Sequence, residues 1–331
     1  MSTTMNDVVS RQREYGPLRS LVRSQPFWVT MALGMMCLVM AHVSNVFFTE
    51  DNLFNVTRNF AFIGIIALGM TAVIITGGID LSVGSVVGVA GIVAGMVLHA
   101  GHSWWLGVLA GILTALACGT INGVLIAYMR LSSFIVTLGM FGVARSLAQV
   151  LSQNHMIYEF GPDEKIFNQI GGGTLFGVAN VFIVLVVLTV ILVIVLRYTT
   201  WGRWVYAIGG NEQAARLTGV PVSRIKVSVY TLSALMSGIS AVLLVGWQGA
   251  AINAMGTGYE LRAIASSVIG GADLMGGAGG GYGAFIGAAL IEVIRNSLLL
   301  AGVDPNWEGT FIGLFIVFAV MLSKFRGVRA G

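Results

Sequence analysis

Long apolar stretches recur along almost the whole chain, separated by short polar segments. A hydrocarbon core about 30 Å thick needs roughly 20 apolar residues of α-helix, so the pattern predicts ten membrane-spanning helices. The spans are residues 26–48, 59–77, 83–100, 104–128, 132–151, 178–196, 227–247, 260–274, 281–301 and 309–324. Only a short glycine-containing segment divides the second span from the third, and only a glycine tract divides the eighth from the ninth. Eight longer elements therefore remain an alternative count.

The composition supports a membrane protein. Of the 331 residues, 56% are hydrophobic and only 10% are charged, and the mean hydropathy is +0.87. A typical soluble domain carries about 25% charged residues, so a soluble globular enzyme and a disordered chain are both excluded. We expect an all-α polytopic membrane protein. Its two cysteines, Cys37 and Cys118, lie in apolar runs and form no paired motif.

The basic residues indicate how the chain is oriented. With the N-terminus inside, the inner segments hold 13 of the 18 Lys and Arg residues. These 13 are Arg11, Arg13, Arg19, Arg23, Arg130, Arg197, Arg203, Arg216, Arg224, Lys226, Lys324, Arg326 and Arg329. The outer segments hold only Arg58, Lys165 and Arg262. Cytoplasmic loops of membrane proteins carry such an excess, which also accounts for the net charge of +4 without nucleic acid.

This orientation sets the predicted organisation of the chain. Residues 1–25 form a cytoplasmic tail, residues 26–324 a transmembrane domain with an inner loop at 197–226, and residues 325–331 a second cytoplasmic tail. The polar, basic start lacks a cleavage site after the first span, so we expect an uncleaved first helix.

A short motif occurs twice. Gly-Gly-Ile-Asp-Leu at 77–81 returns as Gly-Gly-Ala-Asp-Leu at 270–274, each between two apolar stretches. Helix breaks that carry a polar group at corresponding points of two halves indicate the central site of a transporter. In the predicted topology both copies run in the same direction, which suggests an internal parallel repeat.

Glycines spaced four apart also recur within the spans. The pairs are Gly84/Gly88, Gly91/Gly95, Gly107/Gly111, Gly119/Gly123 and Gly283/Gly287. Small residues at this spacing let helix backbones approach closely in lipid, so we expect most of these glycines to serve packing.

No set of residues for catalysis or metal binding is present in the sequence. A nucleotide-binding P-loop needs a lysine after its glycines, but none of Lys165, Lys226 and Lys324 follows a glycine. His99 and His102 have no carboxylate or thiol nearby in sequence. We therefore expect no catalytic residue, no metal site and no cofactor on this chain.

Polar residues within the spans are the candidates for a substrate pathway. Charges there are costly and mark function by default, although Asp80 and Asp273 could equally cap the following helices at the membrane surface. Glu292 and Arg295 are three residues apart and can pair with each other. A sugar needs hydroxyl-bonding groups beside an aromatic face. The pathway candidates are Asp80, Asn122, Thr137, Arg145, Trp247, Gln248 and Asp273.

The inner loop between the sixth and seventh spans predicts a short helix. Asn211 suits its N-cap and Glu212 its first turn, while Gly219 suits the left-handed position after its end and Pro221 stops it. So short a helix is marginal in water, so we expect it to dock against a partner protein or the membrane domain; an ordinary connector is the alternative. Its predicted coupling residues are Asn211, Glu212, Ala214, Ala215, Arg216 and Gly219.

Three stretches carry a family resemblance. They are residues 77–85, residues 122–139 with Asn-Gly and Phe-Ile-Val-Thr-Leu-Gly, and residues 211–219. With them the chain resembles the membrane permeases of bacterial ATP-binding cassette importers for monosaccharides, the ribose, xylose, arabinose and galactose group. One departure is Ser132-Ser133, where many relatives carry a proline, and it affects only the local kink.

The resemblance implies about ten helices in the bacterial inner membrane and two permease copies per complex, either identical or homologous. It also implies a cassette ATPase that hydrolyses ATP on the cytoplasmic side and a periplasmic sugar-binding protein. Members of this family also carry polyols and related compounds, so the cargo stays open. The alternatives are a secondary transporter coupled to ions through Asp80 or Asp273 and, less favoured, a membrane-embedded enzyme or scaffold.

Overall fold

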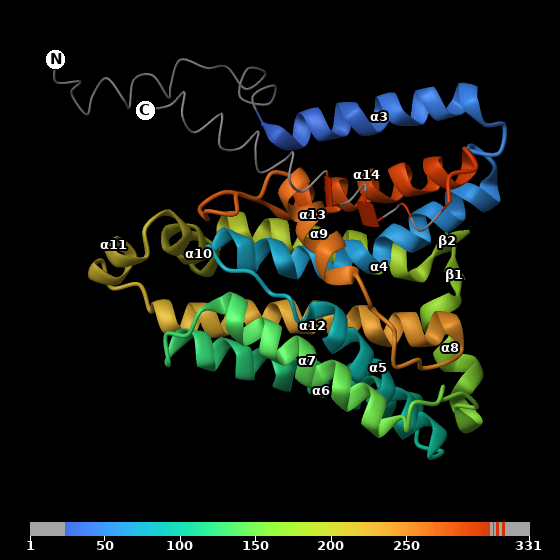
Figure 1. Ribbon diagram of the computed structural model, residues 1–331, viewed down its shortest axis with the longest axis horizontal. Coiled ribbons are helices and arrows are strands. Elements are labelled where there is room, and N and C mark those ends of the chain that lie inside the picture. Colours follow the sequence, from blue (N-terminus) through green and yellow to red (C-terminus); the bar gives the residue numbers. More distant parts are fainter. Residues whose placement is uncertain (1–23, 305–306, 308, 311–312, 315–331) are drawn as a thin grey trace.

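The computed structural model describes residues 24–304, 307, 309–310 and 313–314 (Figure 1). The described elements are α3 (Gln25–Val43), α4 (Glu50–Ile75), α5 (Val83–His99), α6 (Trp104–Ala127), α7 (Ser133–Leu151), η1 (Gly161–Asp163), α8 (Glu164–Gly172), β1 (Thr174–Leu175), β2 (Val178–Ala179), α9 (Asn180–Tyr198), α10 (Thr200–Gly210), α11 (Glu212–Leu217), α12 (Val222–Gln248), α13 (Tyr259–Ile269) and α14 (Gly281–Leu300). The two strands form one small antiparallel hairpin. The predicted all-α polytopic fold is thereby confirmed.

Seven described helices are long and apolar enough to cross a membrane, and α5 is a shorter apolar helix. The second predicted span begins too late, because α4 already starts at Glu50 rather than at residue 59. Thr49 caps this start by accepting a hydrogen bond from the Asn52 backbone N–H. Most of the tenth predicted span, 309–324, and the two tails except residues 24–25 lie outside the described residues.

The eighth predicted span, 260–274, was wrong. Helix α13 has only 11 residues, which at 1.5 Å per residue gives about 17 Å, roughly half of a hydrocarbon core. Residues 249–258 before it form neither a helix nor a strand, apart from a single bridge at Ala251. The chain thus re-enters the bundle as irregular backbone and turns helical only part-way through.

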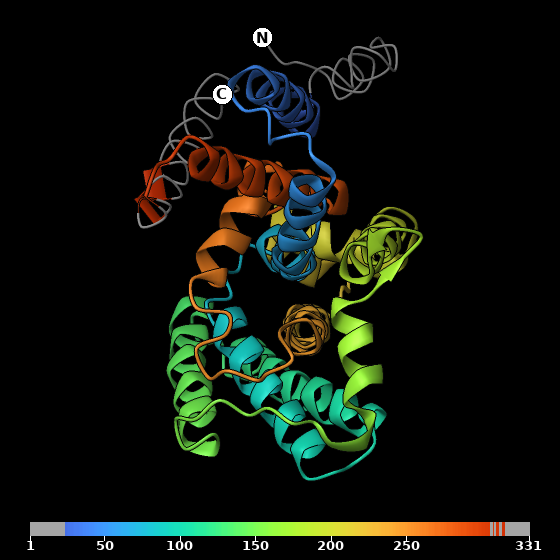
Figure 2. The same ribbon diagram turned by 90° about the vertical axis from the view of Figure 1, so that its right-hand side faces the viewer.

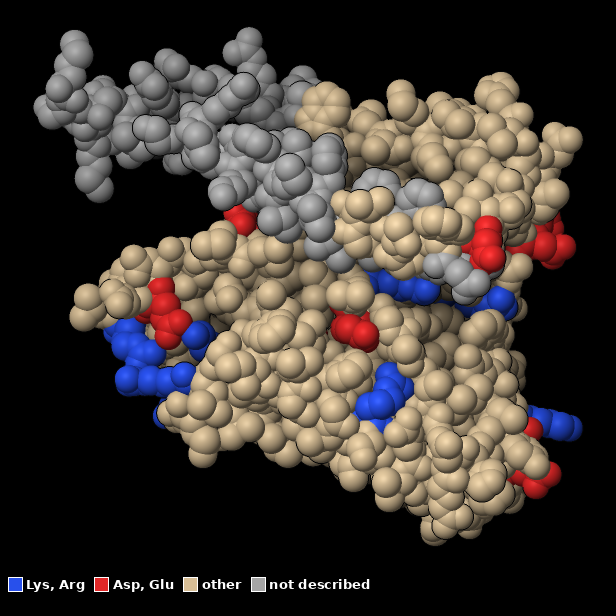
Figure 3. Space-filling model, viewed as in Figure 1, with Lys and Arg blue, Asp and Glu red and all other residues tan. Residues whose placement is uncertain are grey.

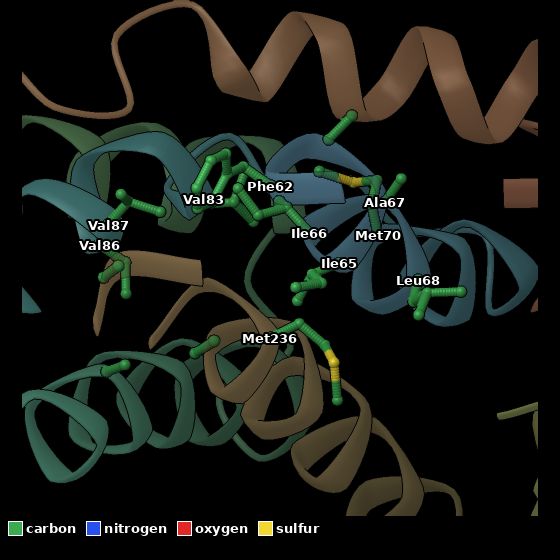
Figure 4. Packing of buried hydrophobic residues seen from close by; sticks show 14 of the residues in the cluster. Phe62, Ile65, Ile66, Ala67, Leu68, Met70, Val83, Val86, Val87 and Met236 are labelled. Atoms are coloured by element: carbon green, nitrogen blue, oxygen red, sulfur yellow. The ribbon is translucent and has the colours of Figure 1, made fainter. Parts of the chain in front are cut away.

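Helices α4 and α12 form the centre of the molecule. Helix α12 packs against α4, α5, α6 and α8, and α4 packs against α9, α13 and α14. Helix α3 lies outermost, against α14 (Figure 2). Figure 4 shows side chains of α4, α5 and α12, including Ile65, Met70 and Met236, pointing into a shared apolar core. Helices α10 and α11 mark one end of the bundle, the α11 end, and α8 with the hairpin marks the other, the α8 end (Figure 1).

The glycine pairs serve two kinds of packing. A Cβ at Gly119 or Gly123 of α6 would collide with α12, at Ala234 and Val227 respectively, as expected for closely packed helices. A Cβ at Gly84 of α5 would instead collide with the Gly256 carbonyl of the irregular segment 249–258, and one at Gly88 would lie tightly against the Asn253 and Met255 carbonyls at 3.2 Å. The α5 glycines therefore make room for the re-entrant chain rather than for another helix.

We predict that Gly84→Ala lowers the thermal stability of the purified protein, because overpacking of this kind costs about 1–3 kcal/mol. Gly139→Ala on α7 is the matched control, since a Cβ there meets nothing within 4 Å and Ala favours a helix over Gly. The melting temperatures of the two variants in detergent check this. Equal melting temperatures would contradict the role assigned to the α5 glycines.

Candidate functional site

Asp80 lies in the first helix break, between α4 and α5, and is almost completely buried, with 1% of its surface exposed. Its carboxylate accepts hydrogen bonds from the Ser82 backbone N–H at 3.0 Å, the Ser82 hydroxyl at 2.6 Å and the Ser233 hydroxyl at 2.9 Å. The two donors of Ser82 bond one carboxylate oxygen and the Ser233 hydroxyl bonds the other. Asp80 therefore fastens the start of α5 to the middle of α12.

Two further pathway candidates gather at this break. Asn122 of α6 donates through Nδ2 to the Ser82 hydroxyl at 3.0 Å. Thr137 of α7 donates to the Ile79 carbonyl at 3.3 Å and the Ser133 carbonyl at 2.8 Å. Both side chains are fully buried. Thr137 thus bonds the irregular backbone of the break directly, while Asn122 of α6 and Ser233 of α12 bond its side chains Ser82 and Asp80.

This cluster lies deep in the bundle. Ser233 stands 11 positions after the first residue of the 27-residue helix α12, so Asp80 lies about 17 Å along a helix of about 40 Å. The N-cap of α5 is Ser82, and Asp80 bonds the backbone N–H of that residue near the middle of the bundle and not in a surface loop.

Asp273, the matching residue of the second motif, has a different environment. It is half-buried and accepts a hydrogen bond from the Met275 backbone N–H at 2.9 Å. Its glycine loop lies at the α11 end, where the Gly277 N–H donates to the Ile75 carbonyl at 2.9 Å. Both motif copies end helices at this same end, in agreement with the parallel direction predicted, but only the first copy carries a buried acid.

Arg145 of α7 holds the second break. Its Nη1 donates to the carbonyls of Asn253 at 2.6 Å and Met255 at 3.0 Å, which satisfies backbone acceptors of the re-entrant segment. Its Nη2 is buried and has no hydrogen-bond partner. Gly88 of α5 lies directly against Nη1, so the guanidinium crosses the α5 surface.

Glu260 was not among the pathway residues predicted from the sequence. It lies in the first turn of α13, and its Oε2 adjoins Gly84, one helical turn from Gly88. This Oε2 is also buried without a hydrogen-bond partner. The irregular segment before α13 carries Glu260 into the bundle, and the sequence signal for this was the unusual shortness of the eighth span.

The remaining pathway candidates, Trp247 and Gln248, lie at the C-terminal end of α12, directly before the irregular segment 249–258. Trp247 packs on Phe62 with ring centroids 5.6 Å apart. The Arg58 guanidinium lies over the Trp247 ring, 4.6 Å from the ring centroid. Gln248 is exposed and ends α12 at the α8 end. The seven candidates therefore do not line one cavity.

Helix α11 matches its sequence prediction closely. The Asn211 Oδ1 accepts the Ala214 backbone N–H at 2.9 Å, as an N-cap does. At the other end Gly219 has φ +86°, and the Val220 N–H donates to the Ala215 carbonyl, which closes the helix as a Schellman motif. The sequence reasoning missed α10, which directly precedes α11, so the loop holds two short helices.

Glu212 bridges two cations at this position. Its carboxylate pairs with Arg216 at 3.1 Å and with Lys226 of α12 at 2.6 Å, and the second contact ties α11 to the bundle. Burial raises the pKa of the Glu212 carboxyl, but hydrogen bonds and charges from Lys226 and Arg216 outweigh burial and hold this pKa below its ordinary value. The side chain of Leu217 is 89% exposed, while Ala215 is buried.

Comparisons with known proteins assign the class. The family described as branched-chain amino acid transport system / permease component matches residues 52–320. A probable ABC transporter permease of Sinorhizobium fredii is 39% identical over 280 residues, 85% of this chain and 83% of that protein. The ribose import permease of Bacillus subtilis is 38% identical over 295 residues, 88% of this chain and 91% of that protein.

A solved structure is also similar. An inward-facing conformation of a putative metal-chelate type ABC transporter gives a TM-score of 0.50 at 16% identity, over 91% of this chain and 98% of that chain. This likeness concerns the fold alone. Together the fold and the sequence matches define a multi-pass inner-membrane permease of the ATP-binding cassette class. The chain belongs to the branched-chain amino acid transport system / permease component family.

We predict that Asp80→Ala costs about 3 kcal/mol of stability, because it strands buried donors of Ser82 and Ser233. Asp80→Asn keeps one acceptor and should cost clearly less. Asp273→Asn is the control in the second motif and should leave the melting temperature almost unchanged, since its side chain bonds only a loop. Equal losses for Asp80→Ala and Asp273→Asn would show that Asp80 has no special structural role.

Proposed function

We propose that this permease is the translocation subunit of an ATP-driven importer for a monosaccharide or a related polyol. The relatives support this cargo. Besides the ribose permease, they include a fructose import permease of Rhizobium meliloti, 34% identical over 322 residues, and an L-arabinose permease of Azospirillum brasilense, 34% identical over 280 residues. The family description mentions amino acids, but these close relatives carry sugars.

In this proposal the energy comes from a cassette ATPase partner, because the chain has no P-loop of its own. The single observation that carries the coupling role is α11, a capped helix that presents an exposed leucine to its surroundings and is braced against α12 by Glu212 and Lys226. Movement of α11 by the ATPase would be passed to α12 through this ion pair.

The proposed orientation places the α11 end in the cytoplasm together with both chain termini. The described basic residues near that end support it, and Figure 3 shows a group of Lys and Arg residues there. A periplasmic sugar-binding protein would then deliver cargo at the α8 end, and a second permease copy, identical or homologous, would complete the channel.

The proposed route for the cargo follows the face of α5, α7 and α13, between the two helix breaks. Figure 3 shows acidic and basic side chains near the centre of this face. Arg145 and Glu260 each keep a buried polar atom without a partner, and such atoms can bond the hydroxyl groups of a sugar once the route opens. Rocking of one part of the bundle against the other would alternate access.

An ion-coupled secondary transporter is not favoured. Asp80, the acid on which that alternative chiefly depends, is 1% exposed and already bonded to three donors. Asp273 lies in a loop at the α11 end.

We predict that Glu212→Lys abolishes sugar uptake by the assembled transporter while membrane insertion persists, because it replaces both ion pairs with repulsion from Arg216 and Lys226. Gly219→Pro should do the same, since proline cannot adopt the positive φ of this position. Uptake of labelled sugar into cells and the amount of inserted permease are measured together. Gln213→Ala on the same helix is the control, and normal uptake in both test variants would refute coupling through α11.

We further predict that Leu217→Asp weakens binding of the ATPase partner at least tenfold, because burying a leucine in an interface contributes about 1.5–3 kcal/mol. Leu217→Met keeps the apolar surface and should bind almost normally. Co-purification of the ATPase with the permease from detergent extracts reports the difference. Equal recovery with both variants would mean that Leu217 does not face the ATPase.

A further inference from the structure

A lateral cleft exposes part of α12 between α6 and α9. One groove of about 540 Å³ runs between α6 and α12, and a second of about 250 Å³ runs between α9, α10 and α12. Ser228 and Leu232 of α12 line both grooves, so the two are adjacent on either side of one helix ridge. This cleft is separate from the face of α5, α7 and α13.

The cleft is confined to the half of α12 nearer the α11 end. Toward the α8 end, helix α8 covers α12, since a Cβ at Gly171 would collide with the Leu243 carbonyl and one at Gly246 with the Phe167 carbonyl. Figure 2, seen from the α8 end, shows α8 beside α12 at this place. The cleft therefore opens sideways toward one leaflet only.

Most residues that line the cleft are apolar, and the hydroxyls of Ser228 and Thr231 are already hydrogen-bonded within the protein. The larger groove is lined by Val124, Tyr128, Arg224, Val227, Ser228, Thr231, Leu232 and Leu235. The smaller is lined by Leu188, Ile191, Leu192, Val195, Trp201, Ser228, Leu232 and Met236. The Ser228 hydroxyl accepts from Trp201 Nε1 at 2.8 Å and donates to the Ile225 carbonyl at 2.8 Å. The Thr231 hydroxyl donates to the Val227 carbonyl at 2.9 Å, so neither hydroxyl needs a partner from the occupant.

One cation stands at the mouth of the cleft. Arg224 is exposed in the first turn of α12, and Tyr128, which is 59% exposed, lies beside it in the lining of the larger groove. A guanidinium and a phenolic hydroxyl can both donate hydrogen bonds to a phosphate. From Arg224 to Leu235 the helix rises about 17 Å, close to the roughly 15 Å hydrocarbon thickness of one leaflet.

We propose that this cleft binds one phospholipid from the leaflet at the α11 end. Its phosphate lies at Arg224 and Tyr128. Its two acyl chains occupy the two grooves, one on each side of Leu232. The lipid covers a part of α12 that none of the elements between residues 24 and 304 covers, and it fills the space between α6 and α9. The site does not depend on which solute the permease carries.

The test is a titration of the purified full chain in detergent with dioleoyl phosphatidylglycerol, with bound lipid counted by native mass spectrometry. We expect one tightly retained lipid per chain. Arg224→Gln should weaken its retention about fivefold, the usual effect of one basic residue on an anionic lipid. Arg203→Gln, an exposed arginine on α10 outside both grooves, is the matched control and should retain the lipid normally.

A second pair of variants tests the acyl grooves. Leu232→Trp fills both grooves and should abolish tight retention of the lipid. Leu188→Trp fills only the smaller groove and should weaken retention, and it replaces the first variant if that one does not fold. Short-chain dihexanoyl phosphatidylglycerol should bind weakly even to the wild type, since it leaves most of the cleft empty.

Equal lipid retention by the wild type, Arg224→Gln and both tryptophan variants would overturn the proposal. So would a lipid-free dimer that Leu232→Trp converts to a monomer, because a second copy of the chain would then occupy the cleft. Cross-linking of a lipid that carries a photoreactive acyl chain should map to residues 124–128, 188–201 or 224–236, which line the two grooves, and mapping elsewhere would also contradict the site.

Discussion

Irregular backbone inside a lipid bilayer must find its hydrogen bonds within the protein, because no water is present to supply them. Two breaks in this bundle, at 76–82 and 249–258, meet that requirement in different ways. At the first, the Asp80 carboxylate binds the start of α5, and Ser233 ties it to α12. At the second, Arg145 binds two carbonyls of the re-entrant chain, and the α5 glycines leave space for its backbone. The remaining helices pack around these two breaks, whose polar groups are hydrogen-bonded to neighbouring elements.

The same constraint joins structure to transport. A continuous apolar helix has no free groups that can hydrogen-bond a polar solute. Broken helices, in contrast, bring charged and amide groups to the centre of the bundle. Here Arg145 and Glu260 contact the surface of α5 one helical turn apart. Each has one buried polar atom without a hydrogen-bond partner. The driving movement would arise elsewhere, at α11, whose ion pair to Lys226 links it to α12. Since α12 also carries Ser233, it connects the coupling helix with the first break.

Features set by neighbouring residues, such as helix caps, could be predicted from the sequence. Contacts between residues far apart in the sequence could not. The caps of α11 at Asn211 and Gly219 follow from side-chain size and positive φ, so residue types alone predicted them. Hydropathy found the long helices but counted 260–274 as a span, because a half-length helix followed by glycines has the same composition as a whole one. The doubled motif suggested two equivalent acids, yet only Asp80 is buried. Its partner Ser233 stands 153 positions away, and Asn122, which bonds the Ser82 hydroxyl, stands 40 positions from Ser82, so no local pattern could join them.

The most direct test of the account measures solute movement by the purified chain in lipid vesicles. The permease is reconstituted with and without a cassette ATPase and a sugar-binding protein. Uptake of labelled ribose, fructose and arabinose is followed with ATP, without ATP, and under an imposed proton or sodium gradient. The account predicts uptake only when both partners and ATP are present. Uptake by the permease alone, or uptake that follows an ion gradient without nucleotide, would contradict it.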